Sequence, residues 1–247
     1  NFDGARGYLL GEPNQGLQAM FTFMNTARIG TALQGIAHME LGYQKSLAYA
    51  KDRLQMRSVT GPKNPDGPAD PIIVHPDVRR MLLTQKALSE GGRMMVAYTG
   101  KLVDVIECTT DEMEKKSAED MLSFMTPIAK AFLTETGFES ANLALQCFGG
   151  HGYIKEWGVE QNVRDARIGM LYEGTTGIQA LDFIGRKVLG SGGVLLQNFT
   201  REIHHFCKEN AEVAELHEFI EPLQALNKKW GELTLHIGTK AMENADE

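Results

Sequence analysis

The sequence predicts an all-α protein built from long helices. Apolar side chains recur at every third or fourth position over long stretches, which is the spacing of one helix face. No stretch after residue 8 alternates apolar and polar residues in the way a half-buried strand does. The chain also holds 12 methionines among its 247 residues, and these flexible side chains fill the irregular gaps between packed helices well.

The first 16 residues are rich in glycine and other turn-forming residues. Within them, residues 8–10 (Tyr-Leu-Leu) are apolar, and we expect them to form the last short strand of a β-domain that lies upstream. Apolar residues then follow a helical period from residue 17 to about residue 57. A helix of about 40 residues would be roughly 60 Å long, a length that is typical of a helical bundle.

The next segment separates the first helix from a second one. Residues 58–74 contain four prolines and two glycines, which predicts a loop. A second helix is expected to start at residues 75–77 (His-Pro-Asp), because proline fits the first turn and an acid there interacts favourably with the helix dipole. Its apolar face continues to about Cys108.

Residues 111–119 are mostly charged, and we expect them to form a solvated connection. Thr126-Pro127 then marks the start, or a kink, of a third helix that continues to residue 146. A turn over residues 149–158 and a short helix over about residues 160–168 are expected to follow.

The C-terminal part continues the helical pattern. A helix is expected from Thr175 to about Leu189, and two further helices, richer in charge, from residue 195 onward, with Pro222 interrupting the second. We therefore predict three parts: the tail of an upstream β-domain (1–16), a helical bundle (17–189) and a C-terminal helical extension (190–247).

Composition argues against several classes of protein. The net charge of −7 and the lack of a lysine–arginine stripe give no indication of nucleic-acid binding. No apolar run approaches the ~18 residues of a membrane span.

Three widely spaced cysteines without a CxxC motif suggest reduced thiols in a cytoplasmic protein. The chain starts at Asn1 and stops inside a helical pattern, so we expect it to be part of a longer protein.

We predict no metal site. A di-iron centre in a helical bundle needs two Glu-x-x-His motifs, and the sequence supplies one, from Glu202 to His205. A zinc site at His204, His205 and Cys207 would need a companion pair of ligands at suitable spacing, which the sequence lacks.

The residues that carry chemistry lie between Gln146 and Gln179. This stretch holds a glycine cluster and, beside an expected helix start at Thr175, the carboxylate of Glu173. An anion there could act as a cap or first-turn residue, stabilised by the helix dipole by roughly 0.3–1 kcal/mol. It could instead be a general base directed into a pocket. Local chemistry leaves both uses open.

The motifs of this stretch stand in a recognisable order. They are Gln146, then Gly149, Gly150 and Gly152, then Arg164-Asp165, then Tyr172-Glu173-Gly174-Thr175, with 27 residues from Gln146 to Glu173. This order resembles the C-terminal signature of the acyl-CoA dehydrogenase family, flavoenzymes that oxidise acyl-CoA thioesters at the α and β carbons. The resemblance covers about residues 8–189 and implies the end of a middle β-domain followed by a four-helix up-and-down bundle. Residues 195–247 resemble, mainly by position, the extra C-terminal helices of larger bacterial members.

The resemblance implies that Glu173 is the catalytic base. In the family this glutamate removes the α-proton while a hydride leaves the β-carbon for flavin N5, and its backbone N–H helps to hold the thioester carbonyl. A minority of members place the base one residue before the arginine of the first bundle helix. Here that position is Ala27, before Arg28, and alanine cannot act as a base.

The resemblance also implies FAD as the cofactor, bound across subunits. It places Gln146, Gly149 and Gly150 at the diphosphate and adenine end of FAD, Thr175 near the adenosine part, and Arg53 toward the FAD of a second subunit. Glycines suit this role because they let the backbone approach phosphate closely. The chain departs from the family pattern in two places, with Gly177 where glutamine is common and Gln55-Met56 where Thr-Phe is common.

The implied partners are an acyl-CoA substrate, an electron-transfer flavoprotein and a second copy of the chain, in a homodimer or a dimer of dimers. The resemblance does not indicate which acyl group the substrate carries. We expect the isolated 247 residues to be inactive and to bind FAD weakly or not at all. Two rival readings are a flavin oxidase or monooxygenase on the same fold, which would usually lack the glutamate, and a non-catalytic helical module for binding, including DNA binding, or oligomerisation.

Overall fold

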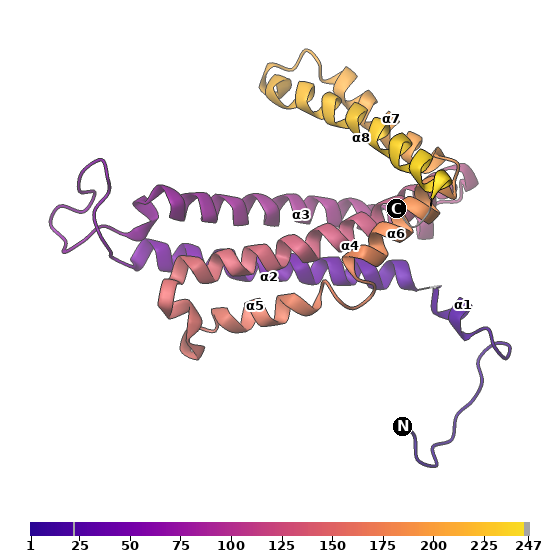
Figure 1. Ribbon diagram of the computed structural model, residues 1–247, viewed down its shortest axis with the longest axis horizontal. Helices are drawn as coiled ribbons and strands as arrows, with labels where there is room; N and C mark the ends of the chain where they lie inside the picture. The colour runs from indigo at the N-terminus through magenta and orange to yellow at the C-terminus, as the bar shows by residue number, and fades with distance from the viewer. Residues whose placement is uncertain (22, 245–247) are drawn as a thin grey trace. The chain divides into compact units, whose positions relative to one another are not determined.

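The computed structural model describes residues 1–21 and 23–244. Every regular element in this part of the chain is helical, so the all-α prediction is confirmed (Figure 1). The α-helices are α1 (Gly16–Phe21), α2 (Met24–Asp52), α3 (Pro76–Cys108), α4 (Glu112–Phe148), α5 (Val159–Ile168), α6 (Thr176–Leu181), α7 (Val194–Glu209) and α8 (His217–Glu243). The strand expected at residues 8–10 is absent: these residues are exposed, and they have no strand among the described residues to pair with.

The chain forms two compact units. The first contains residues 1–97 and 129–175, and the second contains residues 98–128 together with those from 176 on. The three-part division expected from the sequence stays a prediction.

A close contact between α2 and α4 organises the core of the first unit. Ala32, Ile36 and Met39 of α2 pack against Ala129 and Leu133 of α4 in one buried cluster. Two glycines allow the backbones to approach. A Cβ atom at Gly35 would collide with the Leu133 carbonyl oxygen, and a Cβ at Gly137 would lie 2.8 Å from the Gly35 carbonyl oxygen.

A polar contact links α2 to α3. Glu40 of α2 accepts a hydrogen bond from Ser89 Oγ at 2.7 Å and forms an ion pair with Arg93 at 3.1 Å. A hydrogen bond from Gln44, together with the contacts to Ser89 and Arg93, lowers the pKa of Glu40 from 4.5 to about 2. The carboxylate therefore stays charged well into the acidic range and joins the two helices.

The start of α4 corrects the prediction for residues 111–119, which are helical from Glu112 on. Asp111 Oδ1 caps this helix by accepting hydrogen bonds from the backbone N–H groups of Met113 (2.8 Å) and Glu114 (3.3 Å). Pro127 lies inside α4 rather than at its start. A proline removes a single backbone hydrogen bond, and the long helix continues on both sides of it.

Two other boundaries differ from the sequence-based expectation. The first long helix is divided into α1 and α2, and α2 ends at Asp52 instead of residue 57, because Leu54 pairs with Pro71 and Met56 has a left-handed backbone. Pro222 does not interrupt α8; it lies in the second turn of that helix, which continues past it to Glu243.

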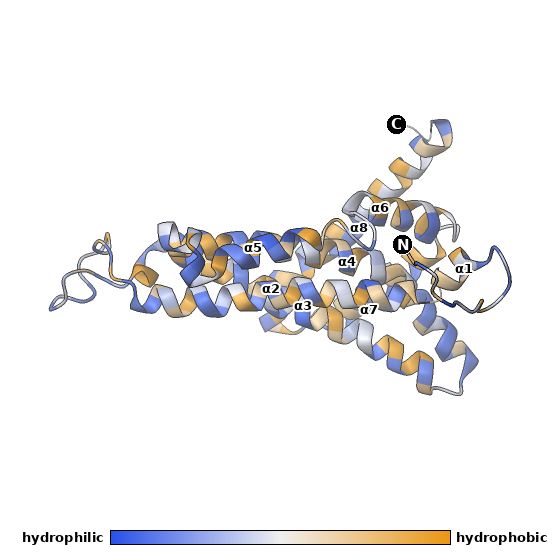
Figure 2. Ribbon diagram, turned by 90° about the horizontal axis from the view of Figure 1, so that it is seen from below, coloured by the Kyte–Doolittle hydropathy of each residue, from blue (hydrophilic) through white to orange (hydrophobic). Residues whose placement is uncertain are grey.

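The short helix α5 packs along α2 within the first unit. Asn162 makes two contacts with His38 of α2, one to the ring Nδ1 at 2.8 Å and one to the carbonyl oxygen at 3.1 Å. The rest of α5 is mostly hydrophilic, as its blue ribbon in Figure 2 shows. The helix therefore covers α2 with a narrow face and leads the chain directly to Glu173.

The second unit is built around aromatic rings. Phe124 of α4 lies 5.1 Å, centroid to centroid, from both Phe183 and Phe199, and Trp230 of α8 lies 5.4 Å from Phe199. After α6 the chain continues as a π-helix over Asp182–Leu189, and α7 and α8 then pack side by side as a hairpin (Figure 1).

We expect Gly35→Ala to destabilise the protein by about 1–3 kcal/mol, because the added methyl group would push α2 away from α4. The measurement is urea unfolding of the chain. Gly30→Ala is the matched control: it lies on the same helix with open space around it, and it should be neutral or stabilising by about 0.5–1 kcal/mol. Equal unfolding midpoints for the two variants would contradict the close α2–α4 contact.

Candidate functional site

Glu173 lies in a tight turn between α5 and α6. Its backbone is left-handed, with φ +57°, and Gly174 follows with φ +91°. Helix α6 begins two residues later, at Thr176. Glu173 is half-buried, and a left-handed conformation is unusual for a residue that has a Cβ atom. Strained backbone of this kind persists where the surrounding structure holds it.

Two side chains from other helices hold this turn. Tyr172, next to Glu173, donates a hydrogen bond from its hydroxyl to the side-chain oxygen of Gln34 on α2. On the other side, Lys130 of α4 donates from Nζ to the carbonyl oxygen of Gly174 at 2.6 Å. The turn is therefore fixed directly before and directly after Glu173.

Lys130 is completely buried, with 0% of its surface exposed. Burial lowers its pKa, the nearby positive charge of Arg28 lowers it further, and the carboxylates of Glu135 and Glu173 act in the opposite direction. Lys130 was not predicted from the sequence as a site residue. The signal was a single lysine inside the otherwise apolar run of residues 128–133.

The second group of expected site residues lies where the C-terminal ends of α2 and α4 meet. Tyr49 of α2 stacks on Phe148 of α4 with ring centroids 4.1 Å apart, and Trp157 packs edge-on against Tyr49. The Tyr49 hydroxyl and His151 Nδ1 share a hydrogen bond of 2.9 Å. These rings support the turn that carries Gly149 and Gly150.

The backbone of the turn at Gly149 and Gly150 is exposed. Gly149 has φ +58°, and open space surrounds the position of a Cβ atom at both Gly149 and Gly150. The side chain of Gln146, one turn earlier, is exposed. Arg53 follows the last residue of α2 as its C-cap, and its Nε is buried without a hydrogen-bond partner among the described residues. A cation, an exposed amide and an exposed glycine backbone suit an anionic, nucleotide-like ligand.

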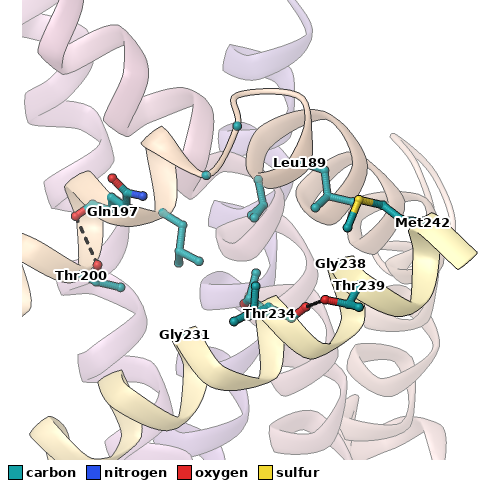
Figure 3. A pocket seen from close by; sticks show the side chains of 13 residues that line it. Leu189, Gln197, Thr200, Gly231, Thr234, Gly238, Thr239 and Met242 are labelled. Atoms are coloured by element: carbon teal, nitrogen blue, oxygen red, sulfur yellow. Dashed lines mark hydrogen bonds between the residues drawn. The ribbon is translucent and has the colours of Figure 1, made fainter.

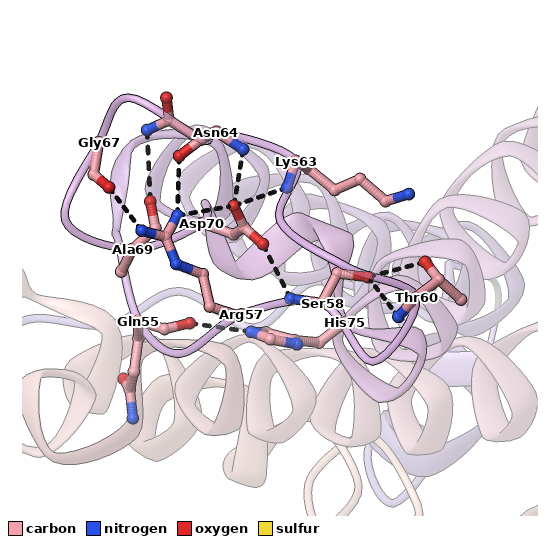
Figure 4. A network of polar contacts seen from close by, with 10 residues as sticks. All are labelled: Gln55, Arg57, Ser58, Thr60, Lys63, Asn64, Gly67, Ala69, Asp70 and His75. Carbon is pink, nitrogen blue, oxygen red and sulfur yellow. Dashed lines mark hydrogen bonds and ion pairs between the residues drawn. The ribbon is translucent and has the colours of Figure 1, made fainter.

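The loop after Arg53 is organised by one buried carboxylate (Figure 4). Asp70 accepts hydrogen bonds from the backbone N–H groups of Ser58 (2.8 Å), Lys63 (2.9 Å) and Asn64 (2.7 Å), and it pairs with Arg57 at 3.3 Å. Burial alone would raise the pKa of Asp70, but these bonds lower it to about 2. The loop therefore depends on a charged Asp70.

All the expected site residues belong to the first unit, but they form two groups. Glu173 and Thr175 lie beside Lys130, in the middle of α4, whereas Gln146 lies near its C-terminal end. The interval from Lys130 to Gln146 corresponds to about 24 Å of helix at 1.5 Å per residue. Within one chain, the carboxylate and the glycine turn are therefore separate sites.

The second unit has a cavity of its own, next to α7 and α8 (Figure 3). Its volume is about 420 Å³, and most of its lining is apolar or glycine, with Leu189, Leu196, Gly231 and Gly238 among the residues around it. None of the expected site residues lines this cavity.

No helix among residues 1–21 and 23–244 is long and apolar enough to cross a membrane. In the same residues, no three or more His, Cys, Asp or Glu side chains are grouped in a way that could hold a metal ion.

The helical fold and the order of its motifs agree with what comparison with known proteins finds. The model of the acyl-CoA dehydrogenase C-terminal domain matches residues 14–189. The 3-methylmercaptopropionyl-CoA dehydrogenase of Ruegeria pomeroyi is 48% identical over 202 residues, which is 82% of this chain and 34% of that protein. The chain belongs to the acyl-CoA dehydrogenase family, and it spans about a third of the length of this curated relative.

Other relatives agree in sequence or in fold. The broad-specificity linear acyl-CoA dehydrogenase FadE5 of Mycobacterium tuberculosis is 36% identical over 208 residues, covering 84% of this chain and 34% of that protein. The crystal structure of Caenorhabditis elegans ACDH-11 in complex with C11-CoA superposes with a TM-score of 0.80 over 95% of this chain and 37% of that one. Its sequence identity is 19%, so this likeness supports the fold alone.

We expect Asp70→Asn to destabilise the loop after Arg53 in a pH-dependent way. Because the pKa of Asp70 is lowered from 3.8 to about 2 in the folded protein, its contribution is fully present above about pH 4 and is lost as the pH falls through about 2. The difference in Tm between wild type and variant should therefore be largest above pH 4 and should shrink toward pH 2. Asp66→Asn, at an exposed site in the same loop, is the control. A Tm difference that stays constant across this range would contradict the assignment.

Proposed function

We propose that the chain is the C-terminal part of an FAD-dependent acyl-CoA dehydrogenase and that Glu173 is its catalytic base. The observation that carries the proposal is the ordered series of motifs from Gln146 to Glu173, which ends in a strained and doubly anchored turn. Family membership supports the reaction class, and the roles of individual residues are inferred from their positions and contacts.

The conformation of Glu173 favours the base over a simple cap. A left-handed backbone costs a residue with a Cβ atom about 1–2 kcal/mol, whereas glycine adopts it freely. An anion near a helix N-terminus is worth roughly 0.3–1 kcal/mol, which is less than this cost. A carboxylate kept in this conformation is better explained by chemistry than by capping.

In the proposed reaction, the Glu173 carboxylate accepts the proton from the α-carbon of an acyl-CoA thioester. The electron pair of that C–H bond then forms the α,β double bond as a hydride leaves the β-carbon. Bound FAD supplies the acceptor for this hydride. The backbone N–H of Glu173, whose direction depends on the left-handed turn, would donate to the thioester carbonyl and stabilise its developing negative charge.

The second group of residues fits the anionic and nucleotide parts of FAD. The open glycine turn at Gly149 and Gly150, the exposed amide of Gln146 and the cation of Arg53 would hold the diphosphate and the adenine end. Thr175 is exposed beside the turn of Glu173, and we assign it to the adenosine part of the FAD at that turn.

The separation of the two groups supports a shared cofactor. Gln146 lies near the C-terminal end of α4 and Glu173 lies beside the middle of that helix, so we propose that they serve two different FAD molecules, each completed by a second copy of the chain in a homodimer or a dimer of dimers. The reduced flavin would pass its electrons to an electron-transfer flavoprotein, which is the electron acceptor of acyl-CoA dehydrogenases.

We expect Glu173→Gln in the full-length protein to lower kcat for thioester oxidation by about 10²–10⁴-fold, because the amide cannot accept the α-proton. The measurement is an anaerobic titration with acyl-CoA thioesters, following the oxidised flavin band. The panel should include 3-methylmercaptopropionyl-CoA and butyryl-CoA, because relatives are named for these substrates.

Glu156→Gln is the matched control, since Glu156 is an exposed glutamate of the same stretch. It should leave the bleaching of the flavin unchanged. Near-normal turnover of Glu173→Gln would refute the assignment of the base. A bound flavin in the wild type that no thioester bleaches would favour the oxidase or the binding-module alternative.

The isolated 247 residues are expected to bind FAD weakly or not at all and to lack dehydrogenase activity, because the chain spans only about a third of the length of the Ruegeria pomeroyi relative. The measurement is an absorbance spectrum after incubation with FAD and gel filtration. A stoichiometric flavin spectrum from this chain alone would contradict the expectation.

A further inference from the structure

We propose that Lys130 is a positioning residue for the catalytic turn: its ammonium group, bound to the Gly174 carbonyl oxygen, keeps Glu173 in the conformation that removes the α-proton. This inference rests on the proposed function of Glu173. It assigns to α4 a role in catalysis beyond that of a bundle helix.

The burial of Lys130 is the first argument. Lysine is almost never fully buried unless it is paired, because transferring an ammonium ion out of water is unfavourable. Lys130 is 0% exposed, and its neighbours on α4, Ala129 and Leu133, are core residues. An apolar side chain would suit this environment better if packing were the only requirement. The charged group is therefore present for what it contacts, which is the turn.

The geometry of the turn is the second argument. Glu173 and Gly174 are consecutive left-handed residues, and such backbone needs contacts that hold it in place. The bond from Lys130 Nζ to Gly174 O is 2.6 Å long, and a hydrogen bond from a charged donor is stronger than one between neutral groups. It acts on the residue directly after Glu173, so it holds the turn on that side of the carboxylate.

The charges around the turn are the third argument. The Lys130 ammonium and the Glu173 carboxylate are close enough to interact electrostatically. Arg28 of α2 is also buried and lies close enough to Lys130 to lower its pKa, so two cations lie near the turn. Attraction toward these cations restricts the positions that the Glu173 carboxylate can take, which is what a general base requires.

The test is Lys130→Met in the full-length flavoprotein, since methionine keeps a similar length without the charge or the donor. We expect kcat to fall by about 10- to 100-fold, because a small displacement of a reacting group has effects of that order, while KM and flavin content change little. Hydrogen exchange should become faster in residues 172–175 and stay unchanged in α4. Lys116→Met is the matched control: this exposed lysine lies on the same helix and should leave all four readouts unchanged.

Other outcomes separate this proposal from the proposed function. If Glu173→Gln is inactive but Lys130→Met keeps a normal kcat, Lys130 has no positioning role and the base assignment stands. If Glu173→Gln is active, the function itself fails. A parallel loss of kcat, flavin content and Tm in Lys130→Met would show a purely structural lysine. Should Lys130→Met fail to fold, Lys130→Gln replaces it: its side chain is neutral and one bond shorter, so it loses the charged bond to the Gly174 carbonyl oxygen, and wild-type kcat there would overturn the proposal.

Discussion

The first unit depends on the close approach of α2 to α4. Gly35 and Gly137 allow the two backbones to touch, and this contact determines which side chains can meet on either side of it. On α4, Lys130 lies one turn before Leu133, whose carbonyl oxygen faces Gly35. On α2, Gln34 lies beside Gly35. Both residues that anchor the turn of Glu173 are therefore positioned by the same pair of glycines. A wider spacing of the helices would move Gln34 and Lys130 apart and would distort the turn that they share.

The anchored turn shows how the fold stabilises a strained backbone. A left-handed glutamate would relax on an isolated loop, because few residues with a Cβ atom occupy this region. Here the hydroxyl of Tyr172 and the carbonyl of Gly174 are bound from two different helices, α2 and α4. The strain is compensated by contacts with rigid elements, and the carboxylate lies on a support that cannot easily move.

The sequence predicted helix positions well where the apolar period was unbroken. Helices α3 and α5 begin and end within about two residues of their predicted limits, as is usual for boundary assignments. The start of α4 was wrong because a charged segment and a proline were both read as interruptions. Asp111 caps the N-terminus of α4, so the charged residues after it form the first turns of the helix. The helix also continues through Pro127. Capping and packing decided these cases, and neither follows from composition.

The site was only partly predictable for a related reason. Glu173 and the glycine turn are local motifs that a reader of the sequence can find. Lys130 is not, because its partner is a backbone carbonyl 44 residues away in the sequence, and backbone carbonyls leave no mark on residue type. Its one trace is a charge inside an apolar run, which would ordinarily indicate a residue reaching toward solvent at the edge of the helix. Complete burial removes that explanation, and then the lysine must have a partner inside the fold. A charged residue within an apolar helix face is therefore evidence for a second, distant element that needs it, and here that element is the turn of the proposed base.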